Sequence, residues 1–133
     1  MSKSHYLNTD LEIESREDLS PIVGYFGKDV MVLFHGEAMG FRRAVFEIAG
    51  LAADADTVIN HFCMLAESLP ERERAIWNHC SRKICDIGYE GGTHPRAFRS
   101  EIRPETVERI AKLGVAIFVT IYSPSPGSEG EAQ

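Results

Sequence analysis

The chain lacks a long apolar run, a secretion signal and an abundance of cysteine. No apolar run approaches the roughly 20 residues that a membrane-spanning helix needs. The first residues, Met-Ser-Lys-Ser-His-Tyr, contain no apolar core of the kind found in signal peptides. The three cysteines, Cys63, Cys80 and Cys85, are odd in number, which favours reduced thiols. We therefore expect a cytoplasmic protein that does not enter a membrane.

An excess of positive charge is also missing. The sequence has 14 Lys and Arg against 20 Asp and Glu, a formal net charge of -6. This balance argues against nucleic-acid binding through net charge, although it leaves room for a local basic patch. A length of 133 residues, 44% of them hydrophobic, suits one globular domain with a real core. We expect a single domain over residues 1–123 and a disordered Pro-, Ser-, Gly- and Glu-rich tail over residues 124–133.

The spacings that mark metal and cysteine-protease sites are absent. There is no Cys-x2-Cys, His-x3-His or His-Glu-x2-His motif, whereas zinc needs convergent ligands. His61 and Cys63 fall on an expected helix, where residues two apart point about 200° from each other. Cys85 could pair with His79 as a nucleophile, but it alternates with apolar residues along an expected strand, which favours a buried structural thiol. We expect no metal, no cofactor and no catalytic residue.

Apolar periodicity predicts an α+β domain. In chain order it indicates a strand over 6–13, a helix ending at 27, and strands over 29–35 and 41–48. A helix from 54 or 56 follows, then a second helix that starts from a capping box at 68–71. The rest of the chain is expected to form a strand over 83–90, a short edge strand over 97–102, a helix over 104–113 and a strand over 115–122. The first six units match the β-α-β-β-α-β pattern of a ferredoxin-like sandwich. The last helix and strand would extend the same mostly antiparallel mixed sheet, with helices mainly on one face.

The closing strand is the most apolar part of the chain. Pro104 suits the first turn of the preceding helix, and Gly114 suits its end. Residues 115–122 are then apolar on both alternating faces, which is typical of a strand covered on both sides. We expect this strand to lie inside the sheet, with other strands beside it and with Phe118 buried.

The order of elements resembles the bacterial domain of unknown function 4279. The similar features are a short helix stopped by Gly27, a central amphipathic helix that runs into a second one, and a last helix ending Leu113-Gly114 before an apolar strand ending Ile121-Tyr122. The resemblance covers most of residues 6–122. That family often shows a tryptophan and a Gly-Asp near its second strand, where this chain has residues 34–37, Phe-His-Gly-Glu. The family carries no established activity, so the resemblance implies a fold and no site.

A basic segment is the first candidate binding site. It contains His94, Arg96, Arg99 and Arg103 and follows two glycines, 91 and 92. Guanidinium groups and glycine-loop amides suit a phosphate or a carboxylate. If the segment is an extended strand, Arg99 lies on the face opposite Arg96 and contributes more to such a site. The alternative is a charged edge strand that discourages aggregation.

A second candidate lies at the end of an expected strand, where His35 is followed by Glu37. The two side chains could act as a base and an acid. The alternative is a turn with a polar rim.

The sequence favours a binding or protein-interaction module over an enzyme. An acidic surface suits a basic protein partner, and an immunity protein against a toxin is one concrete form. The alternative is a sensor or enzyme for a small anion, which would use the segment from His94 to Arg103 or the residues around His35. A third hypothesis is a homodimer joined through an edge strand.

Overall fold

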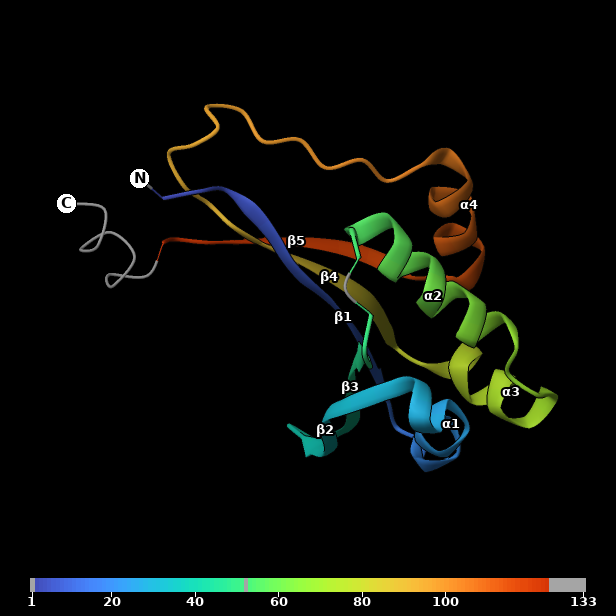
Figure 1. Ribbon diagram of the computed structural model, residues 1–133. Coiled ribbons are helices and arrows are strands. Elements are labelled where there is room, and N and C mark those ends of the chain that lie inside the picture. Colours follow the sequence, from blue (N-terminus) through green and yellow to red (C-terminus); the bar gives the residue numbers. More distant parts are fainter. Residues whose placement is uncertain (1, 52, 125–133) are drawn as a thin grey trace.

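The computed structural model describes residues 2–51 and 53–124, which form one five-stranded sheet with helices packed on one face (Figure 1). The elements are β1 (His5–Ser15), α1 (Ser20–Phe26), the 3-10 turn η1 (Gly27–Asp29), β2 (Val30–Ala38), β3 (Phe41–Ile48), α2 (Ala55–Glu67), α3 (Glu71–His79), β4 (Arg82–Glu90), α4 (Pro104–Leu113) and β5 (Ala116–Tyr122). The expected α+β class is confirmed. The expected disordered tail lies, from residue 125 onward, outside the described residues.

The strand order is β2-β3-β1-β4-β5, with β1 in the centre. β1 pairs antiparallel with both β3 and β4, and β2 pairs antiparallel with β3. β5 pairs parallel with β4. The sheet is therefore mixed and mostly antiparallel, and the α4–β5 unit extends it as the sequence predicted.

Capping groups and turn residues explain where several of the helices and strands begin and end. Asp54 caps α2 by accepting a hydrogen bond from the backbone N–H of Thr57 at 2.9 Å. Gly114 ends α4 in the left-handed conformation, with φ of 73°. The β2–β3 hairpin turns through Met39 and Gly40, both with positive φ, which suits the twist of a two-residue hairpin.

The expected capping box at residues 68–71 is wrong, although a helix does start there. The Ser68 hydroxyl donates to the Leu65 carbonyl and belongs to the end of α2. α3 begins at Glu71 after Pro70, which has no side-chain oxygen to cap it. Two helices separated by only three residues leave Ser68 bound to the first helix rather than the second.

The core lies between the helices and one face of the sheet. Inward side chains of the three central strands supply its floor: Leu11, Ile13, Ala44, Phe46, Cys85 and Ile87. Phe26 of α1 packs edge-on against Phe46, with ring centroids 5.2 Å apart. Trp77 of α3 is buried, and its indole N–H donates to the Leu113 carbonyl at 3.0 Å, which ties α3 to α4.

β5 is an edge strand, so its expected central position is wrong. It pairs only with β4 among the described strands, and Val119 and Ile121 are 59% and 69% exposed. Phe118 is 42% exposed rather than buried. The apolar residues on both faces predicted a strand inside the sheet, but no described element lies beyond the outer edge of β5.

The expected edge strand over residues 97–102 is also absent. This segment has no regular secondary structure and carries the chain from the end of β4 back toward α4 (Figure 1). A parallel β4–β5 pair requires such a return path. The segment cannot pair with β4, because β1 and β5 occupy both edges of that strand.

Two alanine substitutions distinguish the core from this edge. Phe46→Ala removes a fully buried ring and should lower the free energy of unfolding by about 3–5 kcal/mol. Phe118→Ala removes a half-exposed ring and should cost only about 1 kcal/mol. Urea denaturation of both variants measures the difference. Similar losses would contradict the placement of β5 at an exposed edge.

Candidate functional site: carboxylates on the open sheet face

The face of the sheet opposite the helices gathers acidic side chains. Along β1, residues that alternate with the core point to this open face, and register places Asp10 opposite Asp86 of β4. The amide of Asn8 donates to Asp10 Oδ1 at 3.2 Å and to Glu47 Oε2 of β3 at 3.3 Å. Thr120 of β5 donates to Asp86 Oδ1 at 2.6 Å. We call Asp10, Glu47 and Asp86 the carboxylate cluster; they come from three neighbouring strands, and Thr120 of a fourth strand bonds to one of them.

The carboxylate cluster has no cationic partner among residues 2–51 and 53–124. Within the described residues, none of its three carboxylates forms a salt bridge, and Arg43 is paired instead with Glu12, Nε to Oε1 at 2.7 Å. Burial, together with the charges of Glu47, Asp86 and Glu12, raises the pKa of Asp10 to about 6. Near neutral pH the cluster therefore holds negative charge against mutual repulsion.

Glycine and aromatic residues shape the surroundings of the cluster. A Cβ at Gly88 would lie 3.0 Å from Asn8 Oδ1, so the missing side chain makes room for this amide. The Arg82 guanidinium lies 5.2 Å from the Phe118 ring centroid, and that of Arg43 lies 5.8 Å from the Phe34 ring centroid. In the strand register Phe118 lies opposite Asp86, and Phe34 lies opposite Val45, two residues before Glu47.

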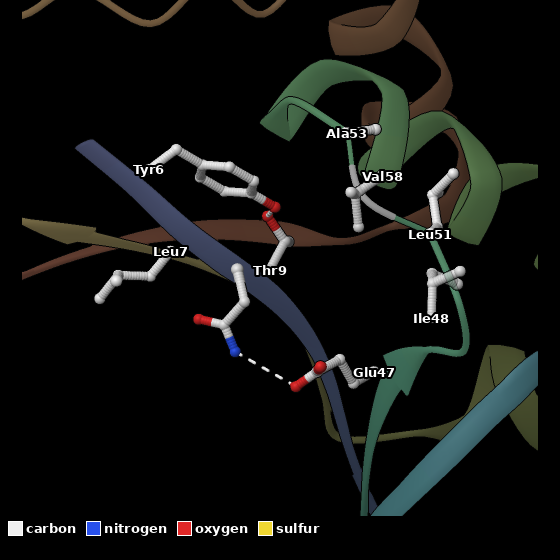
Figure 2. Close-up of a pocket in the computed structure, with 9 residues that line it drawn as sticks. Tyr6, Leu7, Thr9, Glu47, Ile48, Leu51, Ala53 and Val58 are labelled. Carbon is white, nitrogen blue, oxygen red and sulfur yellow. Dashed lines mark hydrogen bonds between the residues drawn. The ribbon is translucent and has the colours of Figure 1, made fainter.

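A cavity of about 110 Å³ adjoins the cluster where β3 ends. β3 pairs with β1 only along residues 11–15, so no described strand lies beside the earlier part of β1 on this side. Figure 2 shows Tyr6 and Thr9 on one side of the cavity, Leu51 and Val58 on the other, and Glu47 beneath them in this view. The cavity thus combines an apolar wall with a carboxylate and with the amide of Asn8.

The cysteines do not offer a reactive thiolate. Burial raises the pKa of Cys63 and Cys80 to about 11 and that of Cys85 to about 12. All three thiols therefore stay protonated near neutral pH. In the part of the chain that the structure describes, no three His, Cys, Asp or Glu side chains are arranged to hold a metal ion. No helix in the same residues is both long and apolar enough to cross a membrane.

The structure does not gather the residues predicted to bind an anion around one cavity. Arg96 and Arg99 are exposed on the irregular segment, so the opposite-face argument, which required a strand, does not apply. Arg103 lies at the N-cap position of α4 without a capping bond from its side chain. Its backbone N–H donates to Asp56 Oδ1 at 2.9 Å, and its guanidinium is exposed. None of these arginines lines the cavity beside β1.

The two predicted histidines lie at opposite ends of β1. His94 forms an isolated bridge with Lys3, just before β1 begins. His35 lies opposite Ala44, which in turn pairs with Ile13 near the end of β1. Ten residues of extended chain separate the two positions along β1, roughly 30 Å. A single site that includes both histidines is therefore excluded, and anion binding by either one stays a prediction.

The sequence contained only part of the signal for the carboxylate cluster. Alternation along the first strand places Asn8 and Asp10 on its polar side, and Asp86 alternates with buried residues in the same way. What was missing is the strand order. Only the pairing of β1 with both β3 and β4 brings Glu47 and Asp86 beside Asp10.

The raised pKa of Asp10 predicts a pH-dependent effect of Asp10→Asn. The folded chain holds this proton up to about pH 6 and the unfolded chain only up to its ordinary pKa of 3.8, so wild-type stability falls as pH rises between these values. Asp10→Asn removes that loss and should stabilise the protein at pH 7.5 but not at pH 4. Thermal melts at both pH values measure this, with exposed Asp29→Asn as the control. Equal effects at both pH values would contradict the raised pKa of Asp10 in the folded chain.

Comparison with known proteins leaves the family open. No protein-family model, no curated protein and no solved structure matches this chain. The ferredoxin-like assignment and the resemblance to the domain of unknown function 4279 therefore stay predictions.

Proposed function

We propose that this protein is an interaction module whose open sheet face receives a basic side chain of a partner protein. The observation that carries the proposal is the carboxylate cluster. Asp10 and Glu47 share the Asn8 amide, Asp86 accepts from Thr120, and none of the three forms a salt bridge with a cation among the described residues. A lysine or arginine placed on Asp10 and Glu47 relieves their repulsion. An anionic partner such as nucleic acid would instead increase it.

The neighbouring cavity supports a long basic side chain in particular. Lysine and arginine carry an apolar stem and a charged head, and they bury the stem where the head can reach a polar group. The apolar wall at Leu51 and Val58 suits the stem, and Glu47 suits the head. A volume of about 110 Å³ is large enough for part of such a side chain but not for a drug-sized ligand.

An immunity-type protein is one concrete form of this module. An immunity protein that neutralises a basic toxin needs an acidic, preformed surface, and charge complementarity also speeds the encounter. The alternative, an anion sensor built on Arg96 and Arg99, has less support, because both side chains lie exposed outside the cavities along the sheet. Membership in the domain of unknown function 4279 would fit either form, since that family has no established activity.

A titration with model compounds tests the proposal without knowledge of the partner. N-acetyl-lysine amide, added to isotope-labelled protein, should shift the NMR signals of the Asn8 side-chain amide and of the backbone amides of Asp10, Glu47 and Gly88. N-acetyl-norleucine amide, which has an apolar side chain and no ammonium group, should shift them at least fivefold less. Binding should also weaken at pH 5, because Asp10 becomes protonated below its pKa of about 6.

Two matched variants test whether the lysine compound binds at the carboxylate cluster. Asp10→Asn should weaken the response to the lysine compound several-fold, whereas Asp29→Asn, an exposed acidic residue on η1, should leave it unchanged. Equal responses to the lysine and norleucine compounds would overturn the proposal. So would a response that Asp10→Asn does not reduce.

A further inference from the structure

The outer edge of β5 is an open pairing surface. β5 pairs with β4 in unbroken register over all seven of its residues, and no described strand lies on its other side. Its backbone N–H and C=O groups on that side are therefore available for another strand. None of the seven residues is charged, glycine or proline, so the strand itself carries none of the usual devices that prevent edge-to-edge pairing.

We infer that this edge joins two copies of the chain in an antiparallel β5–β5 pair, which makes one continuous ten-stranded sheet. A two-fold axis through Val119 pairs all seven residues, whereas any other axis leaves some unpaired. Ile117 then lies opposite Ile121 of the second copy, and Val119 lies opposite itself. No like charges meet, because the strand carries none.

The exposed area is sufficient for such a dimer. Five large side chains of β5 are between 40% and 69% exposed: Ile117, Phe118, Val119, Ile121 and Tyr122. The area that these five side chains expose is together larger than the area of two large side chains that are fully exposed to solvent. At about 200 Å² for each large side chain, this is roughly 500 Å² per copy. Complete burial of this area in both copies would give on the order of 1,000 Å² as an upper limit for β5 alone, the lower end of specific interfaces, before any contribution from α4.

Two apolar grooves on the helix side of β5 extend this surface. One, of about 370 Å³, lies between Phe98 and the residues Val119 and Ile121. The other, of about 350 Å³, lies between Val107 of α4 and Ile117. The two-fold axis is perpendicular to the sheet, so the grooves of both copies lie on the same side and join above the paired strands. Exposed Phe98 and Val107 would add to the buried area.

The opposite edge of the sheet is less suited to pairing. β2 also exposes apolar side chains, but its register with β3 shifts between Val32 and Phe34, and such bulges discourage regular pairing. β2 also carries a charged residue, Glu37, whose carboxylate lies 3.9 Å from the Arg42 guanidinium. These features protect β2 and are absent from β5. The inference does not depend on the proposed function, since the carboxylate cluster lies within one copy.

Sedimentation velocity tests the dimer through matched substitutions at the two edges. The wild-type chain should sediment as a dimer. Val119→Lys places two ammonium groups opposite each other on the two-fold axis and should give monomers. Val32→Lys puts the same charge on the similarly exposed β2 edge and should leave the dimer intact. Circular dichroism identifies any variant that has not folded.

A cysteine substitution tests the register on folded protein. Val119→Cys should form disulfide-linked dimers under air oxidation, because paired antiparallel residues have the Cα separation that a disulfide needs. Met64→Cys, at an exposed position on α2, should not. The three native thiols compete little, since burial raises their pKa values. A wild-type chain that remains monomeric at about 100 μM would overturn the inference. So would dissociation by Val32→Lys alone, or the absence of Val119→Cys linkage.

Discussion

The alternation of β1 between a buried and an open face is the constraint on which the rest of the structure depends. β1 is the central strand and pairs on both sides, so its direction and register determine where β3 and β4 lie. Leu11 and Ile13 point into the core under the helices. A slip of one residue would exchange these side chains with the carboxylates of the opposite face, and such a chain could not fold. The core and the acidic surface are thus two consequences of one pattern.

One-sided coverage by the helices explains why the carboxylates can remain. Burial and then the surrounding like charges raise the pKa of Asp10 to about 6, yet the open face leaves the cluster only partly buried, and repulsion is weaker there than in a core. The core compensates for this unfavourable arrangement through packing such as that of Phe26 on Phe46. The proposed role of the cluster in binding a basic side chain would explain why carboxylates lie together on one surface although burial and repulsion raise the pKa of Asp10.

The two proposed surfaces occupy different parts of the same sheet. The carboxylate cluster lies near the centre, on the face away from the helices, and the apolar edge lies at β5. A β5–β5 pair would leave the open faces of both copies on one side, because its axis is perpendicular to the sheet. Two clusters would then be presented together, and two linked sites bind a partner with repeated basic groups more tightly than one.

Local structure could be predicted from the sequence, whereas the order of the strands in the sheet could not. The start of α2 was predicted at residue 54 or 56 and lies after Asp54, and Gly114 was predicted correctly at the end of α4, because capping groups act within a few residues. The apolar residues of β5 showed that it is a strand but placed it wrongly in the centre, since a pattern of burial does not say whether the same chain or another supplies the cover. Likewise, Asp10 could be assigned to a polar face, but only the order of the strands brings Glu47 and Asp86 beside it, because that order is decided by contacts between residues far apart in the chain.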